Sequence, residues 1–288
     1  FTSTVRKVLS RLRGSYSLVF MCKFEPDKII CSKKDNPLIV GLGQGENYIA
    51  SDIPAILSYT RKTYIMNDGE IAIVMKDNVW VTDLEGKPIS KKVFEVNWDA
   101  EAAEKGGFEH FMLKEIYEQP KAIKDTMSCR ITKDGKHVHF EELNWTPEDV
   151  NSIGKILITA CGTAYHAGLL AKYFIEKLAR IPVEVDIASE YRYRDPLTDS
   201  KTLCIVVSQS GETIDTLAAL KEAKRRGAKT MAVTNVVGSS IARESHDVLY
   251  TWAGPEIAVA TTKAYSTQMA VLNLLGLYFG DILGTVDL

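Results

Sequence analysis

The sequence lacks closely spaced cysteines, a large net charge and a long apolar run, and each absence excludes a class of protein. Its five cysteines are scattered, without the close pairs of a zinc site or the framework of a small secreted domain. The 35 basic and 37 acidic residues nearly cancel and are interspersed, which argues against nucleic acid as a partner. The longest apolar run, residues 269–280, is interrupted by Asn273 and is too short to cross a bilayer. We therefore expect a cytoplasmic protein with reduced thiols that binds a small ligand and no membrane.

What is present is the composition of a globular protein. Of its 288 residues, 45% are hydrophobic and 25% are charged, and this length is sufficient for two domains. The chain opens on Phe1, and Val5, Val8 and Leu9 already lie on one helical stripe. We expect the sequence to start within a domain.

Residues 1–83 are predicted to be mainly β structure. Short strand-like runs alternate with turn signals such as Asn36-Pro37 and Asp68-Gly69, at the spacing of an antiparallel sheet. The glycine-rich residues 41–45 resemble a nucleotide loop, but they lead into a strand at 47–50 rather than a helix. Because a phosphate loop needs a helix N-terminus after it, we predict a hairpin connection there.

The polar, turn-rich residues 84–106 are predicted to be a linker to a second unit, residues 107–288. A helix is expected near His110, and Pro120 is expected to kink or restart it. His110, Glu115 and Glu118 could be metal ligands or acid–base groups, but we favour their assignment as solvated residues on a helix face. No metal site is expected.

After residue 150 the pattern changes to buried apolar strands that alternate with helices. Strands are predicted at 155–160, 183–187, 202–207, 230–234 and 248–251. Five alternations predict an α/β fold with a doubly wound, five-stranded parallel sheet, covered by helices on both faces. Because such sheets hold ligands at the carboxyl ends of their strands, the residues that follow each strand are the candidates for function.

The third of these strands is followed directly by Ser208-Gln209-Ser210-Gly211-Glu212-Thr213 and a helix. A helix N-terminus exposes unpaired N–H groups and a partial positive charge, so a phosphate placed there can also accept hydrogen bonds from the hydroxyls. An ordinary helix cap would need only one such residue. We therefore favour a phosphate-binding turn.

Two more loops follow strands at the same edge of the predicted sheet. Cys161-Gly162-Thr163 follows the first strand and could be either an ordinary helix start or a ligand loop. Residues 253–263 follow the fifth strand, and their small side chains, two threonines and a lysine could complete a pocket. Cys161 has no partner base nearby in the sequence, and His166 falls inside a helix, so neither is favoured as a catalytic group.

These loops resemble the three ligand loops of SIS (sugar isomerase) domains, in particular Val259-Ala260-Thr261-Thr262-Lys263 together with the two loops above. The stretch from His110 to Pro120 and Ala253-Gly254-Pro255-Glu256 resemble the glutamine–fructose-6-phosphate aminotransferase family. The resemblance implies that residues 1–83 are the C-terminal part of a type 2 glutamine amidotransferase domain, similar to N-terminal nucleophile hydrolases. Residues 107–288 would be the isomerase part with its first SIS domain, whose core is 141–288.

The resemblance also implies an activity and a set of site residues. The family makes glucosamine 6-phosphate from fructose 6-phosphate and glutamine, without a dissociable cofactor. The phosphate would be held by Ser208, Gln209, Ser210 and Thr213, and the rest of the sugar by Thr163, Val259 and Thr261. Where the family usually has serine after Gly-Thr, this sequence has Ala164. A homodimer through the SIS-containing part is expected.

The family's N-terminal cysteine nucleophile, second SIS domain and C-terminal tail have no counterpart between Phe1 and Leu288. We therefore expect the chain alone to bind hexose 6-phosphate without turning it over, so that no catalytic residue is assigned to it. A sugar-phosphate-sensing regulatory module is the alternative, but no helix-turn-helix pattern or basic face precedes residue 150. An NAD-dependent oxidoreductase is disfavoured because Gly-x-Gly-x-x-Gly is absent after the first strand of the α/β unit.

Overall fold

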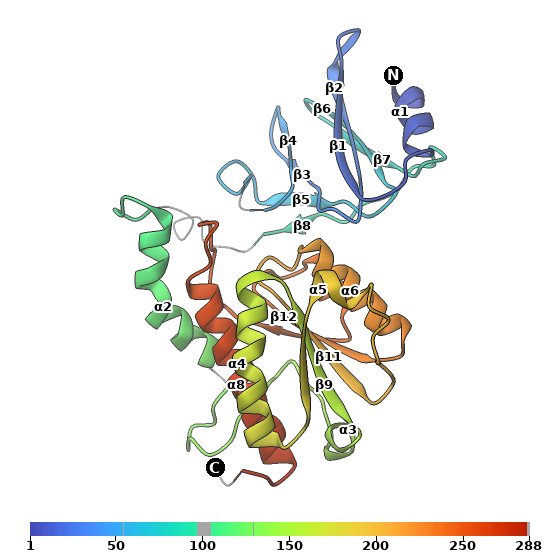
Figure 1. Ribbon diagram of the computed structural model, residues 1–288. Coiled ribbons are helices and arrows are strands. Elements are labelled where there is room, and N and C mark those ends of the chain that lie inside the picture. Colours follow the sequence, from blue (N-terminus) through green and yellow to red (C-terminus); the bar gives the residue numbers. More distant parts are fainter. Residues whose placement is uncertain (54, 97–104, 129, 287–288) are drawn as a thin grey trace. The chain divides into compact units, whose positions relative to one another are not determined.

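The computed structural model describes residues 1–288 except 54, 97–104, 129 and 287–288 (Figure 1). The chain divides into two compact units, Phe1–Glu104 and Lys105–Leu288. The assignment of residues 1–83 to an amidotransferase domain and of 84–106 to a linker stays a prediction.

The first unit contains helix α1 (Thr2–Leu9) and two antiparallel sheets, whereas the sequence pattern predicted one. The first sheet has the order β1 (Tyr16–Cys22), β2 (Glu25–Lys34), β6 (Ile71–Met75), β7 (Val79–Thr82), and the second has the order β4 (Asn47–Ala50), β3 (Ile39–Leu42), β5 (Lys62–Ile65), β8 (Phe94–Glu95). The chain leaves the first sheet at Asp35, whose φ of 62° makes a turn, and Pro37 then lacks the N–H that a ladder requires.

Successive residues of β2 face opposite sides of the first sheet. Ile30 is buried with Val5 and Leu9 of α1, while Cys31 is buried in a second cluster with Val40 of β3. Val5 and Leu9 of the expected helical stripe therefore cover one face of the sheet, whereas Val8 is exposed. The glycine-rich residues 41–45 connect β3 and β4, which pair antiparallel from Ile39↔Ala50 to Leu42↔Asn47, so the predicted hairpin is confirmed.

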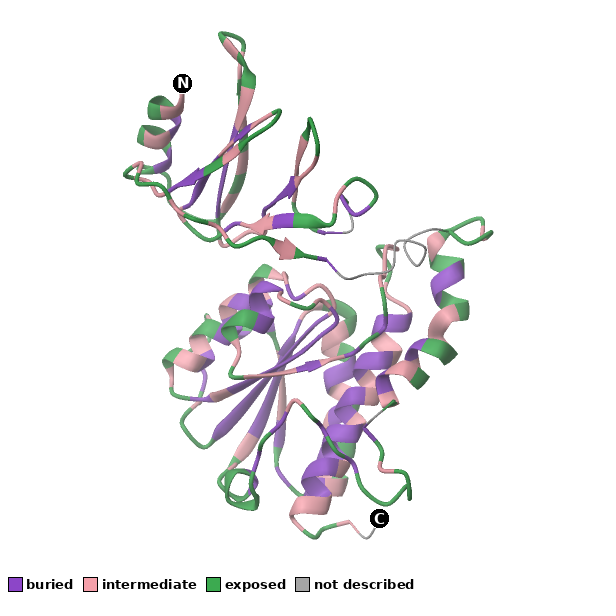
Figure 2. Cartoon of the chain, turned by 180° about the vertical axis from the view of Figure 1, so that it is seen from behind, coloured by how far each residue is buried: buried purple, intermediate pink, exposed green. Residues whose placement is uncertain are grey.

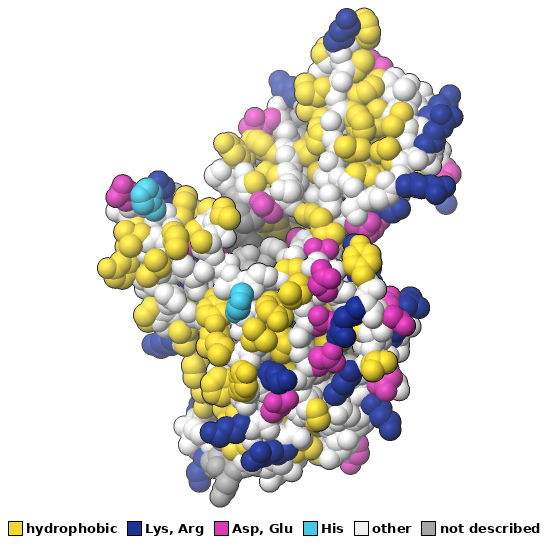
Figure 3. All heavy atoms as spheres, in the orientation of Figure 1, with side chains coloured by type: hydrophobic (Ala, Val, Ile, Leu, Met, Phe, Trp, Pro, Cys, Tyr) yellow, Lys and Arg dark blue, Asp and Glu magenta, His cyan; other side chains and the backbone are white. Residues whose placement is uncertain are grey.

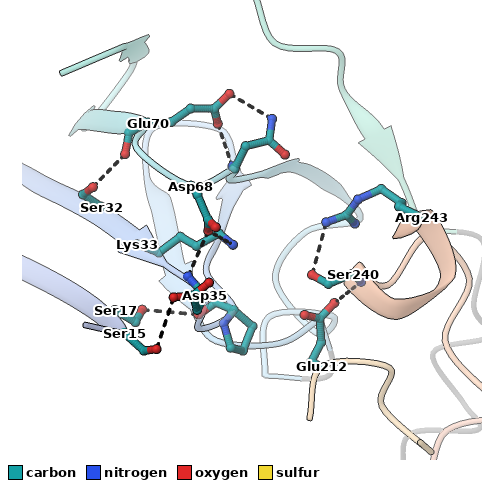
Figure 4. Close-up of polar contacts among 12 residues, drawn as sticks. Ser15, Ser17, Ser32, Lys33, Asp35, Asp68, Glu70, Glu212, Ser240 and Arg243 are labelled. Atoms are coloured by element: carbon teal, nitrogen blue, oxygen red, sulfur yellow. Dashed lines mark hydrogen bonds and ion pairs between the residues drawn. The ribbon is translucent and has the colours of Figure 1, made fainter. Parts of the chain in front are cut away.

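Charged groups buried in the first unit have partners. Lys33 is only 6% exposed, and its Nζ lies 2.6 Å from Asp68 Oδ1 (Figure 4). The Nζ of Lys91 contacts Glu70 at 2.8 Å, and Ser32 Oγ donates to the Glu70 carbonyl. Strand β8 lies within residues 84–106 and pairs with β5.

The second unit is built on a five-stranded, wholly parallel sheet, which confirms the predicted fold class (Figure 1). Its order is β10 (Val183–Ile187), β9 (Lys155–Ala160), β11 (Thr202–Ser208), β12 (Lys229–Thr234), β13 (Asp247–Tyr250). The sequence predicts the central strands well because a strand buried on both faces, as β9 and β11 are, is a nearly continuous apolar run.

Helices cover both faces of this sheet. On one face, α4 (Gly162–Ala179) and α8 (Lys263–Ile282) pack together over Ile156, Ile158 and Ile205. On the other face, α5 (Ala188–Tyr191), α6 (Ile214–Arg225) and α7 (Ser240–Glu244) cover Leu157 and Cys204. Neighbouring residues of a strand therefore belong to different cores, and Figure 2 shows the buried residues concentrated in the strands and the inner helix faces. The short α3 (Pro147–Asn151) precedes β9. No helix within the described residues is long and apolar enough to span a membrane.

Helix α2 (Phe111–Met127) packs against α8 and continues through Pro120, so a restart of the helix at this proline is wrong, while a kink there stays a prediction. Pro120 lacks the N–H that would bond to the Ile116 carbonyl one turn earlier. The Gln119 side-chain amide donates to that carbonyl instead, at 3.1 Å. The replacement donor explains how the helix tolerates the proline.

Candidate functional site: a hydroxyl-lined cavity at the sheet edge

The carboxyl ends of β9 and β11 open into one cavity of about 190 Å³. Six of the seven residues that the sequence predicts to bind ligand lie in its wall: Thr163, Ser208, Gln209, Ser210, Thr213 and Thr261. The seventh, Val259, does not line the cavity, and its side chain is fully exposed. The remaining wall residues are Cys161, Ala164, Val207 and Gln268.

The turn from β11 to α6 is held by its own hydroxyls. Ser208 is the last residue of β11, and its Oγ accepts from the Gly211 N–H at 3.0 Å and lies 2.9 Å from Thr213 Oγ1. Ser210 Oγ accepts from the Glu212 N–H at 3.2 Å. These bonds fix the hydroxyls of the turn in the cavity wall before any ligand arrives.

Gly211 is required in this turn for two reasons. Its φ of 64° lies in the left-handed region, which favours glycine. A Cβ at this position would also lie 2.0 Å from Ser239 Oγ and 2.8 Å from Thr234 Oγ1. The Gly211 carbonyl accepts from the Ile241 N–H at 3.0 Å, so the turn is bonded to the start of α7. A larger residue would push the turn away from this neighbour.

The ordinary helix-cap interpretation does not account for the polar residues of this turn. Thr213 is the N-cap residue of α6, yet it makes no side-chain capping bond, and its hydroxyl pairs with Ser208 instead. Glu212 does not support its own helix, since its carboxylate accepts from the Ser240 N–H at 2.7 Å (Figure 4). The N-cap residue of α4, Cys161, also makes no capping bond. Two helix N-termini without side-chain caps therefore border the same cavity.

The cavity wall is polar but carries no charged side chain among the described residues that form it. An anion bound there would meet the partial positive charge of two helix N-termini, N–H donors and hydroxyls, without a nearby wall carboxylate to repel it. The cavity wall therefore suits binding of an anionic, hydroxylated ligand.

Cys204 in β11 is fully buried, and burial raises the pKa of its thiol to about 12. This thiol is therefore no nucleophile.

The loop that carries Thr261 is attached to α2 by a buried carboxylate. Glu115 is 2% exposed, and its Oε1 accepts from the N–H groups of Ile257 and Ala258 at 2.6 and 3.1 Å. The interpretation of Glu115 as a solvated helix-face residue is therefore wrong. The error arises because its partners are backbone groups more than 140 residues away, which no local pattern reveals.

Two further carboxylates fix the start of α8. Glu256 Oε1 accepts from the N–H groups of Thr262 and Ala264 at 2.9 and 3.1 Å, and so caps the helix in place of the N-cap residue Thr262. Burial raises the pKa of Glu256 above its ordinary value. Glu118 of α2 contacts Lys263, which is 3% exposed, so Glu118 also differs from the predicted solvated residue. His110 is exposed, and no group of His, Cys, Asp or Glu in the described parts of the chain could hold a metal.

Gln268 is a wall residue that was not predicted from the sequence. It lies on the buried face of α8, where most neighbouring positions are apolar. A polar residue on an otherwise apolar helix face is the signal that could have identified it.

Comparisons with known proteins identify the family of the chain. The SIS domain family matches residues 150–278, the part of the chain that contains the sheet and the cavity. The glutamine–fructose-6-phosphate aminotransferase (isomerizing) of Caldanaerobacter subterraneus subsp. tengcongensis is 61% identical over 98% of this chain and 46% of its own length. The aminotransferase of the same name from Clostridium tetani is 58% identical with the same coverage. The chain thus spans about half the length of the curated relatives it matches.

A solved structure is also similar to part of this chain. The C-terminal domain of glucosamine-fructose-6-phosphate aminotransferase from Francisella tularensis is 40% identical, with a TM-score of 0.60, over 64% of this chain and 51% of that one. The parallel sheet, its covering helices and the loops at its carboxyl edge define a SIS domain. The chain as a whole belongs to the glutamine–fructose-6-phosphate aminotransferase family.

Proposed function

We propose that the cavity binds a hexose 6-phosphate, and that the chain supplies the sugar-phosphate site of an enzyme that makes glucosamine 6-phosphate from fructose 6-phosphate and glutamine. The observation that carries this proposal is the hydroxyl-lined cavity bordered by the uncapped N-termini of α4 and α6. A phosphate monoester can be recognised there by N–H groups and hydroxyls, with no need for a metal. The names of the relatives support the rest of the proposal.

The wall residues divide into two groups in this proposal. Ser208, Gln209, Ser210 and Thr213 hold the phosphate, because they form the turn at the N-terminus of α6. Thr163 and Thr261 contact the sugar from the starts of α4 and α8. Val259 is close to Thr261 in the chain and contacts the part of the sugar that projects from the cavity.

Residues 1–83 are proposed to be the C-terminal part of a type 2 glutamine amidotransferase domain. The antiparallel sheets of the first unit and the coverage of the relatives across 98% of the chain support this assignment. In the complete enzyme, such a domain would release ammonia from glutamine for transfer to the sugar.

Self-association through the second unit is proposed from its exposed apolar side chains. Tyr117 of α2 and Tyr173 of α4 are each 69% exposed, and other apolar residues are exposed beside them on both helices: Met112, Leu113, Ile116, Leu170 and Phe174. Figure 3 shows hydrophobic side chains gathered over α2 and α4. Exposed apolar surface of this kind is typical of protein interfaces.

Calorimetric titration with fructose 6-phosphate and glucosamine 6-phosphate tests the proposed ligand. We expect a dissociation constant on the order of 1 mM, which corresponds to a binding free energy of about 4 kcal/mol. Hydrogen bonds to a charged group contribute about 1.5–3 kcal/mol each, so Ser208→Ala with Ser210→Ala should leave little binding. The matched control, Ser152→Ala with Ser245→Ala, removes two hydroxyls that bond to backbone carbonyls outside the cavity. Undiminished affinity in the Ser208/Ser210 variant would refute the proposed site.

A further inference from the structure

Gln268 is a buried polar residue with an unused hydrogen-bond acceptor in the cavity wall. Its side chain is 1% exposed, and its Oε1 has no hydrogen-bond partner within the described residues. Its neighbour Thr267 is equally buried, but the Thr267 hydroxyl donates to the Ala264 carbonyl at 3.0 Å. Burial on α8 is therefore compatible with a satisfied polar group, and the unpaired Gln268 oxygen requires an explanation.

Packing does not explain the choice of glutamine. The same face of α8 buries Ala264, Val271 and Leu272, and a leucine or methionine at 268 would continue this apolar face. A buried amide oxygen without a donor destabilises the folded protein relative to an apolar group of similar shape. The cost is offset only when something that enters the cavity supplies the donor.

We infer that Gln268 accepts a hydrogen bond from the sugar part of the bound hexose 6-phosphate, and so sets the specificity and the orientation of the ligand. This inference rests on the proposed function. A phosphate carries close to two negative charges at neutral pH and offers mainly acceptor oxygens, so it cannot satisfy the Gln268 oxygen. A sugar hydroxyl or amino group is a donor and can do so. Phosphate at the Ser208–Thr213 turn and a hydroxyl or amino group at Gln268 would fix which end of the ligand faces α8.

The test compares ligands with and without a sugar. Binding of fructose 6-phosphate, glucosamine 6-phosphate and inorganic phosphate is followed through the backbone amide shifts of residues 208–213 in the wild-type chain, in Gln268→Met and in Ser266→Ala. Methionine keeps the length of the side chain but cannot accept in the same way. Ser266 is the matched control, because it lies on the same helix and its hydroxyl contacts Gln119 outside the cavity.

Loss of one hydrogen bond should weaken binding of the sugar phosphates about fivefold to tenfold in Gln268→Met, with inorganic phosphate unaffected. Ser266→Ala should bind all three ligands like the wild type. The melting temperature of Gln268→Met without ligand should be equal to or higher than that of the wild type, because an unpaired polar group has been removed. Deoxy analogues of the hexose phosphate should include one whose affinity no longer differs between wild type and Gln268→Met.

Four outcomes would overturn the inference. Equal weakening of inorganic phosphate and sugar phosphates would show a structural role for Gln268, and unchanged sugar affinity would show that it makes no contact. A lower melting temperature for both Gln268→Met and Gln268→Leu would show that the amide has partners within the protein. A wild-type chain that binds neither inorganic phosphate nor hexose 6-phosphate would refute the proposed function itself, and this inference with it.

Discussion

The ammonium of Lys263 lies 2.6 Å from Glu118 Oε2 and joins the first turn of α8 to α2, although 145 residues separate the two in the chain. Lys263 is 3% exposed, whereas the Glu118 side chain keeps 29% of its surface and also lies 3.5 Å from Lys114. Together with the bonds from Glu115 to the loop ahead of α8, this pair makes α2 a support for one wall of the cavity.

The two members of this pair should not be equally sensitive to mutation. Glu118→Ala removes the carboxylate from a buried ammonium and should lower the free energy of unfolding by about 3 kcal/mol. Lys263→Met removes the buried charge and leaves a partly exposed carboxylate. This variant should therefore lose clearly less free energy of unfolding than Glu118→Ala. Urea unfolding of both variants measures the difference.

The exposed pair Lys121–Asp125 of the same helix is the control for this comparison. Its side chains are 79% and 42% exposed, so Asp125→Ala should change stability by less than about 1 kcal/mol. Equal losses for Glu118→Ala and Lys263→Met would contradict the unequal burial of the two charges.

The parallel sheet could be predicted from the sequence almost residue by residue. The predicted strands 155–160 and 183–187 coincide with β9 and β10. β9 is a nearly continuous apolar run that is buried on both faces, whereas β10 is an edge strand in which apolar and acidic residues alternate. The rule that parallel strands end at a common edge indicates where ligand loops lie, and the resemblance to SIS domains identifies the residues within them. Six predicted wall residues accordingly lie around one cavity.

Features that depend on distant partners could not be predicted in this way. The burial of Glu115 depends on two backbone N–H groups that only the fold brings near it. The chain passes from one sheet of the first unit to the other after the turn at Asp35, and no pattern within a single strand shows whether the strands form one sheet or two. Gln268 differs again, because its significance lies in a missing partner rather than in a residue pattern.

Glu256 should make stability depend on pH. Because burial raises the pKa of this carboxyl above 4.5, the folded protein holds a proton that the unfolded chain has already lost in the pH range above 4.5. The contribution to stability is therefore complete below pH 4.5 and is lost as the pH rises through the raised pKa of the folded state. Glu256→Gln keeps an acceptor for the Thr262 and Ala264 N–H groups but cannot titrate.

In urea unfolding experiments, the free energy of unfolding of the wild type should fall as the pH rises from 4.5 to neutral. The fall should be smaller in Glu256→Gln. Glu148→Gln on α3 is the control, because Glu148 is exposed and its replacement should leave the profile unchanged. A wild-type profile that coincides with that of Glu256→Gln would show that this carboxyl does not carry the dependence.

Alanine substitutions at Gly211 and Gly284 distinguish the stability lost through backbone conformation from the stability lost through close packing. The φ angles of the two glycines are nearly the same, 64° and 66°, but a Cβ at Gly211 would lie 2.0 Å from Ser239 Oγ whereas one at Gly284 would meet nothing within 4 Å. Gly284→Ala should therefore lower the free energy of unfolding by about 1 kcal/mol, the cost of an alanine with its backbone in the left-handed region. Gly211→Ala adds an overlap with the start of α7 and should lose about 1–3 kcal/mol more.

The same substitution should also impair ligand binding, because the displaced turn carries Ser208, Ser210 and Thr213. Chemical denaturation measures the two stabilities, and titration with inorganic phosphate measures the site. Ser239→Ala should not rescue Gly211→Ala, since the added Cβ would still lie 2.5 Å from the Cβ of residue 239. If Gly211→Ala and Gly284→Ala lose the same stability and Gly211→Ala still binds phosphate normally, the close approach of the turn to α7 does not shape the cavity.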